Sequence, residues 1–364
     1  MTDLLATLVP VLGRALLDFV WQGAMIGLLA GMVLVALRNA RPHARYAVGY
    51  VALLACALAP LLDIVLLLTS RSGPAVATIG LAGGTATGAL AMLPAVTSWP
   101  AQFESRLPLV VALWSAGASL FLLRHAAGVI WIARMRAGAH DTGTRRQWQR
   151  RLDTLALRFD LMRAPVLRLI DGLDSPVSAG WLRPVILLPA ALILRMPADQ
   201  LEALLAHELA HVRRNDYLAN LLQSVVESLL FYHPVVWWLS CGVRRERERI
   251  ADQLAAEVTG SPRTLAIALS TLSELPHIRH HAPQTAQAAH GGHLMSRIEQ
   301  LVRPGRPPAG RFAFPVLGLA AVCIALYAHA QVSARPAAPA TTESADVTTV
   351  RADARKTEDQ PFAL

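Results

Sequence analysis

Two histidines and a glutamate lie close together in the segment His207-Glu208-Leu209-Ala210-His211. On an α-helix, His211 lies about 40° around the axis from His207, and Glu208 lies about 100° away, so all three side chains project into one arc. Two imidazoles at this spacing can hold one Zn²⁺, and the carboxylate between them can act as general base on an attacking water. The alternative is a helix with two partly exposed histidines. We predict that His207 and His211 are zinc ligands and that Glu208 is the catalytic base.

A catalytic zinc site needs a third protein ligand, and the segment Arg245–Asp252 offers one. Glu248 and Asp252 are four residues apart, so they share one face of a helix. Glu248 can complete the ligand set, and Asp252 can orient an imidazole through its second ring nitrogen. The alternative is a charged helix surface with Glu–Arg pairs, which we prefer for Glu246.

Other polar residues near the motif leave more than one interpretation open. Asp216 follows His211 by five residues and can either orient an imidazole or cap the next helix. His233 precedes a proline at a helix start, which favours a local cap or a core histidine. The later histidines have no fixed ligand spacing, and we expect them to be solvated: His277, His280, His281, His290 and His293.

The elements expected to position these residues form an α+β block over residues 137–311. An amphipathic stretch, Arg145–Phe159, predicts a helix. Three short apolar stretches bounded by turn residues then predict strands, namely Val166–Ile170, Val177–Ala179 and Val185–Leu188. The helix that carries the histidines begins at Pro197, because proline suits a first helical turn and Asp199 complements the helix dipole.

The two halves of the site are separated by an apolar stretch, Tyr217–Val243, which His233-Pro234 interrupts. A single membrane crossing here would put His207 and Glu248 on opposite sides of the bilayer. We therefore predict a helical hairpin packed on the catalytic helix, which reaches the membrane surface through Trp237 and Trp238.

The composition is that of a membrane protein. The chain of 364 residues is 54% hydrophobic and 16% charged, with a mean hydropathy of +0.41, whereas soluble domains have about 25% charged residues. Disordered, collagen-like and disulfide-rich classes are excluded, since hydrophobicity is high and the three cysteines form no CxxC pair. Apolar runs long enough for a bilayer predict four spans, at about residues 15–37, 46–69, 109–133 and 312–332. The uncharged stretch Pro74–Ser98 contains Gly and Pro and favours a loop.

The arginines predict the orientation of these spans. One cluster follows the first span (Arg38, Arg41 and Arg45), and another follows the third, beginning at Arg134. The positive-inside rule places both in the cytoplasm, together with Arg297 and its neighbours before the fourth span. We expect a multi-pass protein of the bacterial inner membrane with residues 1–136 as a membrane domain, a cytoplasmic block, and an outside N-terminus. Residues 333–364 are expected to form a disordered outside tail. The net charge of +9 thus reports topology, and we expect no direct contact with nucleic acid.

The sequence resembles integral-membrane zinc metallopeptidases of the BlaR/MecR antirepressor type, which are gluzincin-like proteases. The segments that carry the resemblance are Ala44–Tyr46, Ser175–Gly180, Arg183–Pro189, His207–Asp216, Phe231–Pro234 with Trp237-Trp238, Glu246–Glu248 with Ala251-Asp252, and Arg297-Ile298. The resemblance implies His207, His211 and Glu248 as ligands of one Zn²⁺, with Glu208 as base. It also implies that Val177, Ser178, Ala179 and Gly180 form an edge strand that pairs with an extended substrate.

The expected fold is therefore a polytopic α-helical membrane protein with a cytoplasmic α+β gluzincin-like zinc metallopeptidase domain. The resemblance implies a signalling endopeptidase that cleaves a cytoplasmic winged-helix repressor of the BlaI/MecI type, itself, or both, and a homodimer is a further expected state. The alternatives are a quality-control protease for membrane proteins and a non-catalytic signalling scaffold. Family members that sense β-lactams carry a penicillin-binding domain after the last span, and residues 333–364 contain no SxxK nucleophile. Direct β-lactam sensing is accordingly not expected.

Overall fold

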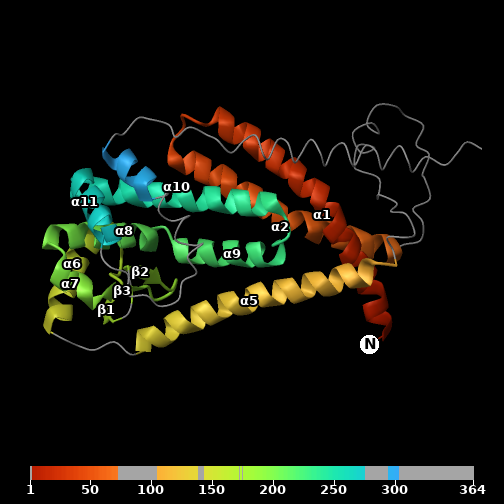
Figure 1. The fold of residues 1–364 in the computed structure, drawn as a ribbon, viewed down its shortest axis with the longest axis horizontal. Helices are drawn as coiled ribbons and strands as arrows, with labels where there is room; N and C mark the ends of the chain where they lie inside the picture. Colours follow the sequence, from red (N-terminus) through yellow and green to blue (C-terminus); the bar gives the residue numbers. More distant parts are fainter. Residues whose placement is uncertain are drawn as a thin grey trace, which may run out of the picture. The chain divides into compact units, whose positions relative to one another are not determined.

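A computed structural model describes residues 2–72, 105–137, 143–171, 173, 175–274 and 294–302 (Figure 1). The predicted loop at Pro74–Ser98, the predicted fourth span at 312–332 and the tail at 333–364 lie outside these residues. So do the histidines between 277 and 293.

Three long apolar helices make up the first part of the chain: α1 (Thr2–Ala36), α2 (Pro42–Ser72) and α5 (Leu107–Ala137). Each contains a stretch long and apolar enough to cross a bilayer, at Thr7–Ala36, Pro42–Thr69 and Leu107–Arg134. Many large apolar side chains on them are exposed, such as Leu66 at 64% and Leu123 at 68%. Soluble proteins rarely expose so many large apolar side chains to water, whereas lipid can cover them. The described part of the chain is therefore that of a membrane protein.

A small sheet follows the helix α6 (Gly143–Arg158). Its strands are β1 (Val166–Ile170), β2 (Val177–Ala179) and β3 (Val185–Pro189), in the order β1-β3-β2. The central strand β3 is buried throughout and pairs in parallel with β1 and antiparallel with β2. No described strand covers the outer edge of β2.

The remaining helices pack on this sheet and on one another. They are α7 (Ala190–Arg195), α8 (Ala198–Arg213), α9 (Asp216–Leu229), α10 (Pro234–Thr259), α11 (Pro262–Glu274) and a last helix over residues 294–302. The core of this part is built from α6, β1, β3, α8, α10 and α11, with Leu167, Leu205 and Leu209 fully buried in it. The sequence patterns did not predict α7 or α11, and α10 continues to Thr259, well beyond the apolar stretch that ends at Val243.

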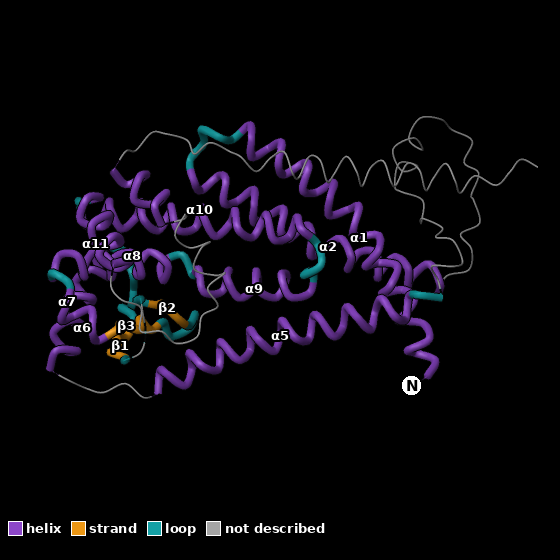
Figure 2. Tube along the Cα trace, in the orientation of Figure 1, coloured by secondary structure: helices purple, strands orange, loops and turns teal. Residues whose placement is uncertain are grey.

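The α9–α10 hairpin inserts among the three long helices, with α10 against α2 and α9 against α5 (Figure 2). At its tip, the hydroxyl of Tyr232 donates a hydrogen bond to the carbonyl of Leu16 at 3.0 Å. The ring Nε2 of His233 lies 3.0 Å from the carbonyl of Val20, and its Nδ1 caps α10 by accepting from the backbone N–H of Val235. Leu16 and Val20 lie well inside the apolar stretch of α1. The tip of the hairpin thus packs against the apolar stretch of α1, a contact that the sequence did not predict.

Candidate metal centre

Helix α8 presents His207 and His211 one turn apart toward the same space. His207 and Glu208 are buried, at 6% and 9% exposure, because α8 packs against the sheet, α10 and α11. The Nε2 atoms of the two imidazoles lie 3.2 Å apart. The HExxH segment therefore folds as the helix that its spacing predicts.

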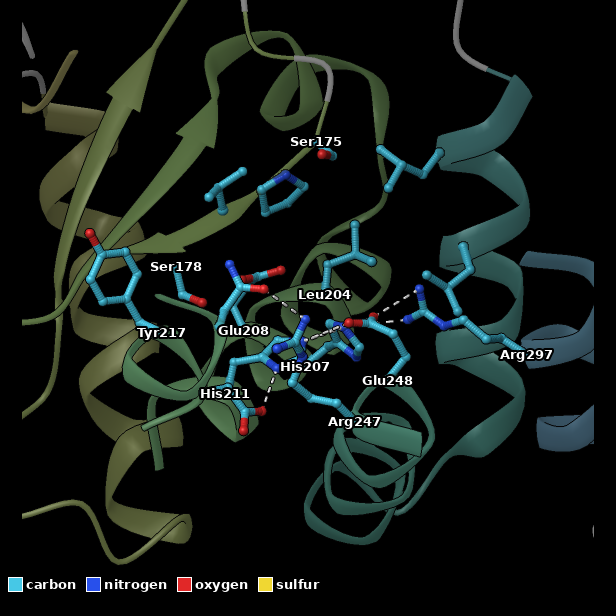
Figure 3. Close-up of a pocket in the computed structure, with 16 residues that line it drawn as sticks. Ser175, Ser178, Leu204, His207, Glu208, His211, Tyr217, Arg247, Glu248 and Arg297 are labelled. Carbon is cyan, nitrogen blue, oxygen red and sulfur yellow. Dashed lines mark hydrogen bonds and ion pairs between the residues drawn. The ribbon is translucent and has the colours of Figure 1, made fainter. Parts of the chain in front are cut away.

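Helix α10 brings Glu248 to the same point from the other side of the cavity (Figure 3). Its Oε2 lies 3.5 Å from Nε2 of His207, and its Oε1 lies 3.7 Å from Nε2 of His211. Neighbouring ligand atoms around a tetrahedral zinc are about 3.3–3.5 Å apart, since zinc bonds to nitrogen and oxygen are about 2.0–2.2 Å long. The spacing of these three donors would suit a zinc ion with little adjustment.

Each imidazole also has a carboxylate behind it. The Nδ1 of His207 lies 3.0 Å from Oδ1 of Asp252, and the Nδ1 of His211 lies 2.8 Å from Oδ2 of Asp216. The contact of His211 with Asp216 has hydrogen-bond geometry, and a carboxylate bonded to Nδ1 holds the proton there, which leaves the lone pair of Nε2 free for a metal. Asp216 reaches this place because Asn215 adopts a left-handed conformation, with φ 53°, and turns the chain between α8 and α9. Asp216 is therefore the first residue of α9, and its side chain contacts the ring of His211.

The charges around the site perturb one another strongly. Burial lowers the pKa of His207, but the carboxylates of Asp252 and Glu248 outweigh burial and raise this pKa to about 9. Burial raises the pKa of Glu248 and of Asp252, but His207 and Arg297 outweigh it and hold both pKa values below their usual range. The two carboxylates thus favour a positive charge at His207.

The donors open into a cavity of about 360 Å³. Glu208 lines it beside the two histidines and is 9% exposed. Val177 and Ser178 of the edge strand β2 also line the cavity, but Ala179 and Gly180 do not. Ala179 is buried at 2% exposure, and Gly180 has already left the strand, with φ 91°.

Known proteins share sequence similarity with this chain. The family model described as BlaR1 peptidase M56 matches residues 16–300, which is most of the chain. The chain belongs to the BlaR1 peptidase M56 family. Its three apolar membrane-capable helices and its mostly helical domain with a small sheet are consistent with this membership.

Individual relatives agree with the family. The chain is 33% identical to the regulatory protein BlaR1 of Bacillus licheniformis over 92 residues, which cover 25% of this chain and 14% of that protein. It is 37% identical to a protease HtpX homolog of Acaryochloris marina, over 22% of this chain and 39% of that protein. It is 25% identical to the methicillin resistance mecR1 protein of Staphylococcus aureus, over 23% of this chain and 14% of that protein. The matches span well under half the length of these relatives.

One residue of this M56 site was not predicted to be there. In the sequence, Arg297 is one of the cations before the predicted fourth span and belongs to one of the segments that carry the resemblance. In the structure, its Nε and one terminal nitrogen each lie 2.8 Å from an oxygen of Asp252, and its other terminal nitrogen lies 3.3 Å from Glu248. Burial lowers the pKa of Arg297, but these carboxylates outweigh it and raise the pKa. No local spacing could have revealed this role, because Arg297 lies 45 residues after Asp252.

Proposed function

We propose that this M56 family member is a zinc endopeptidase in which His207, His211 and Glu248 hold one Zn²⁺. The observation that carries the proposal is the convergence of Nε2, Nε2 and a carboxylate at distances that suit tetrahedral zinc, with Glu208 beside them in the same cavity. A zinc ion held there would polarise the scissile carbonyl and lower the pKa of a water molecule. Asp252 and Asp216 keep the two imidazoles in the tautomer that binds metal.

Glu208 is the proposed general base. It follows His207 directly on α8 and faces the cavity without a competing ion pair among the described residues. Its carboxylate takes the proton of the attacking water and transfers it to the nitrogen of the leaving amine. The outer edge of β2, at Val177 and Ser178, offers backbone groups to an extended substrate beside the cavity. The strand edge would thus hold the peptide, Glu208 would act as the base, and the zinc ion would polarise the scissile carbonyl.

We further propose that the site faces the cytoplasm. Arg45 donates a hydrogen bond from Nε to Oε1 of Glu246 at 3.0 Å, two residues before the proposed ligand Glu248. The site therefore lies at the same end of the long helices as Arg38, Arg41 and Arg45, the end that the positive-inside rule places in the cytoplasm. Reporter fusions at Gly138 and Ala340 test this topology, and an outside location of Gly138 would contradict it.

The substrate proposed is a cytoplasmic winged-helix repressor of the BlaI/MecI type, or the protein itself. Support comes from the family and from relatives whose names describe regulation and methicillin resistance. The direct test is a comparison of wild type with Glu208→Gln in cells of the native organism, with zinc content measured for both. We expect the repressor or this protein to be cleaved only by wild type. Cleavage of other membrane proteins instead would favour quality control, and an unchanged phenotype with zinc retained would favour a scaffold and contradict the proposal.

A further inference from the structure

The cavity contains an arginine that forms no ion pair with any described carboxylate. Arg247 lines the cavity, and it is only 8% exposed. The other arginine there, Arg297, is paired with Asp252 and Glu248, and Asp216 is paired with His211 and Arg214. Among the described residues, no carboxylate oxygen lies within 4.0 Å of a nitrogen of Arg247. Among the described residues that line the cavity, Arg247 therefore forms no ion pair.

The hydrogen bonds of Arg247 are also incomplete. One terminal nitrogen donates to Oδ1 of Asn220 at 3.2 Å, which is an uncharged partner on α9 (Figure 3). The other terminal nitrogen is buried and has no hydrogen-bond partner among the described residues. A buried guanidinium without an anion is costly, so its persistence at a cavity points to a role in binding. Its planar fork suits a carboxylate.

We propose that Arg247, together with Asn220, forms a subsite that binds a carboxylate group of the peptide substrate. The inference rests on the proposed peptidase function. It adds a selectivity that the zinc centre does not provide, because the subsite lies on the α9 side of the cavity. Apolar side chains also line the cavity, namely Leu204, Leu269 and Leu272.

The position of Arg247 favours substrate selection over a role in the bond-breaking step. None of its nitrogens lies within ion-pair distance of Glu208 or Glu248, the groups that mark the reacting centre. A substrate lying along β2 would therefore meet Arg247 with a group outside the scissile peptide unit. That carboxylate can belong to an aspartate or glutamate side chain or to the free C-terminus of a peptide.

Peptide binding to a Glu208→Gln background tests the subsite without a need for turnover. The probes are fluorescein-labelled nonapeptides in matched pairs, with glutamate or glutamine at each internal position in turn, and with a free or an amidated C-terminus. The readout is fluorescence anisotropy with the zinc-loaded protein in detergent. We expect glutamate or the free C-terminus to strengthen binding by about tenfold to 100-fold, the range for a hydrogen bond to a charged group.

Arg247→Gln should remove this preference, measured as the ratio of the affinities for the charged and the neutral peptide of each pair. Arg245→Gln is the matched control, because it removes a cation from the same turn of α10 without changing the cavity lining. If Arg247→Gln does not fold, Arg247→Lys serves instead and should weaken the preference, since lysine keeps the charge but loses the fork. The amidated peptides show whether the carboxylate comes from a side chain or from the C-terminus.

Two results would overturn the subsite. One is equal binding of the charged and neutral peptides in the Glu208→Gln background, and the other is a preference that persists when Arg247 is replaced. Cleavage of neutral peptides by wild type without any carboxylate preference would contradict the subsite alone. Carboxylate-selective binding without cleavage by wild type would instead contradict the peptidase function.

Discussion

The Nδ1 of His211 lies 2.8 Å from the carboxylate of Asp216, the first residue of the helix that follows. Asp216 is 4% exposed and also lies 3.5 Å from Arg214. Asp216 connects the start of α9 to the proposed zinc centre, and Glu248 connects α10 to it. The hairpin that packs among the membrane helices is thus the same element that completes the metal site.

Asp216→Asn should weaken zinc binding by about 10-fold to 100-fold, because an amide neither fixes the tautomer of His211 nor raises its basicity as a carboxylate does. Competition with a fluorescent zinc chelator measures the affinity. Asp199→Asn is the control, since Asp199 is an exposed residue in the first turn of α8. An affinity equal to that of wild type would mean that Asp216 acts only at the start of α9.

Zinc binding should release a proton near neutral pH. The pKa of His207 in the metal-free site is about 9, so below pH 9 the ring is protonated and must lose this proton before Nε2 can bind a metal. The apparent zinc affinity should therefore rise by about tenfold for each pH unit up to about pH 9, and fall as the pH is lowered. Isothermal titration calorimetry at pH 7 in buffers with different ionisation enthalpies counts the protons. Zinc binding with no proton release at pH 7 would contradict the contacts of His207 with Asp252 and Glu248.

Gly117 should be needed for the hairpin to dock against α5. A Cβ atom at this position would collide with the ring of Phe231 at the hairpin tip. Gly117→Ala should lower the free energy of unfolding by about 1–3 kcal/mol, the usual cost of overpacking. Thermal unfolding in detergent measures this change. Gly128→Ala is a matched control on the same helix, because a Cβ there meets no atom within 4 Å, and equal stability of the two variants would show that the close contact is unimportant.

Local elements were largely predictable from the sequence. The strand at Val166–Ile170 has the predicted bounds, and α8 begins one residue after the predicted start at Pro197. Apolar periodicity, proline positions and turn residues determine such elements locally, so the sequence alone indicates them. The residues 207, 208, 211 and 248 also lie together in one cavity, where their types and spacing suggested that they would.

Features that depend on distant contacts were not predictable in this way. The depth of the α9–α10 hairpin follows from contacts of Tyr232 and His233 with α1, more than 200 residues earlier. The place of Arg297 depends on the packing of residues 294–302 against α10. Arg247 looked like one more surface arginine beside Glu246, and only the burial of α10 shows that it lies in the cavity without an anion.

The zinc content of purified Glu248→Ala tests the central claim most directly. Inductively coupled plasma mass spectrometry of the protein, purified without chelators, should find about one zinc per chain in wild type. The same should hold for the control Glu257→Ala, which changes an exposed residue of α10. Glu248→Ala should retain less than about a tenth of that zinc, since two histidines alone bind it weakly. A full equivalent of zinc in Glu248→Ala, or none in wild type, would contradict the proposed centre.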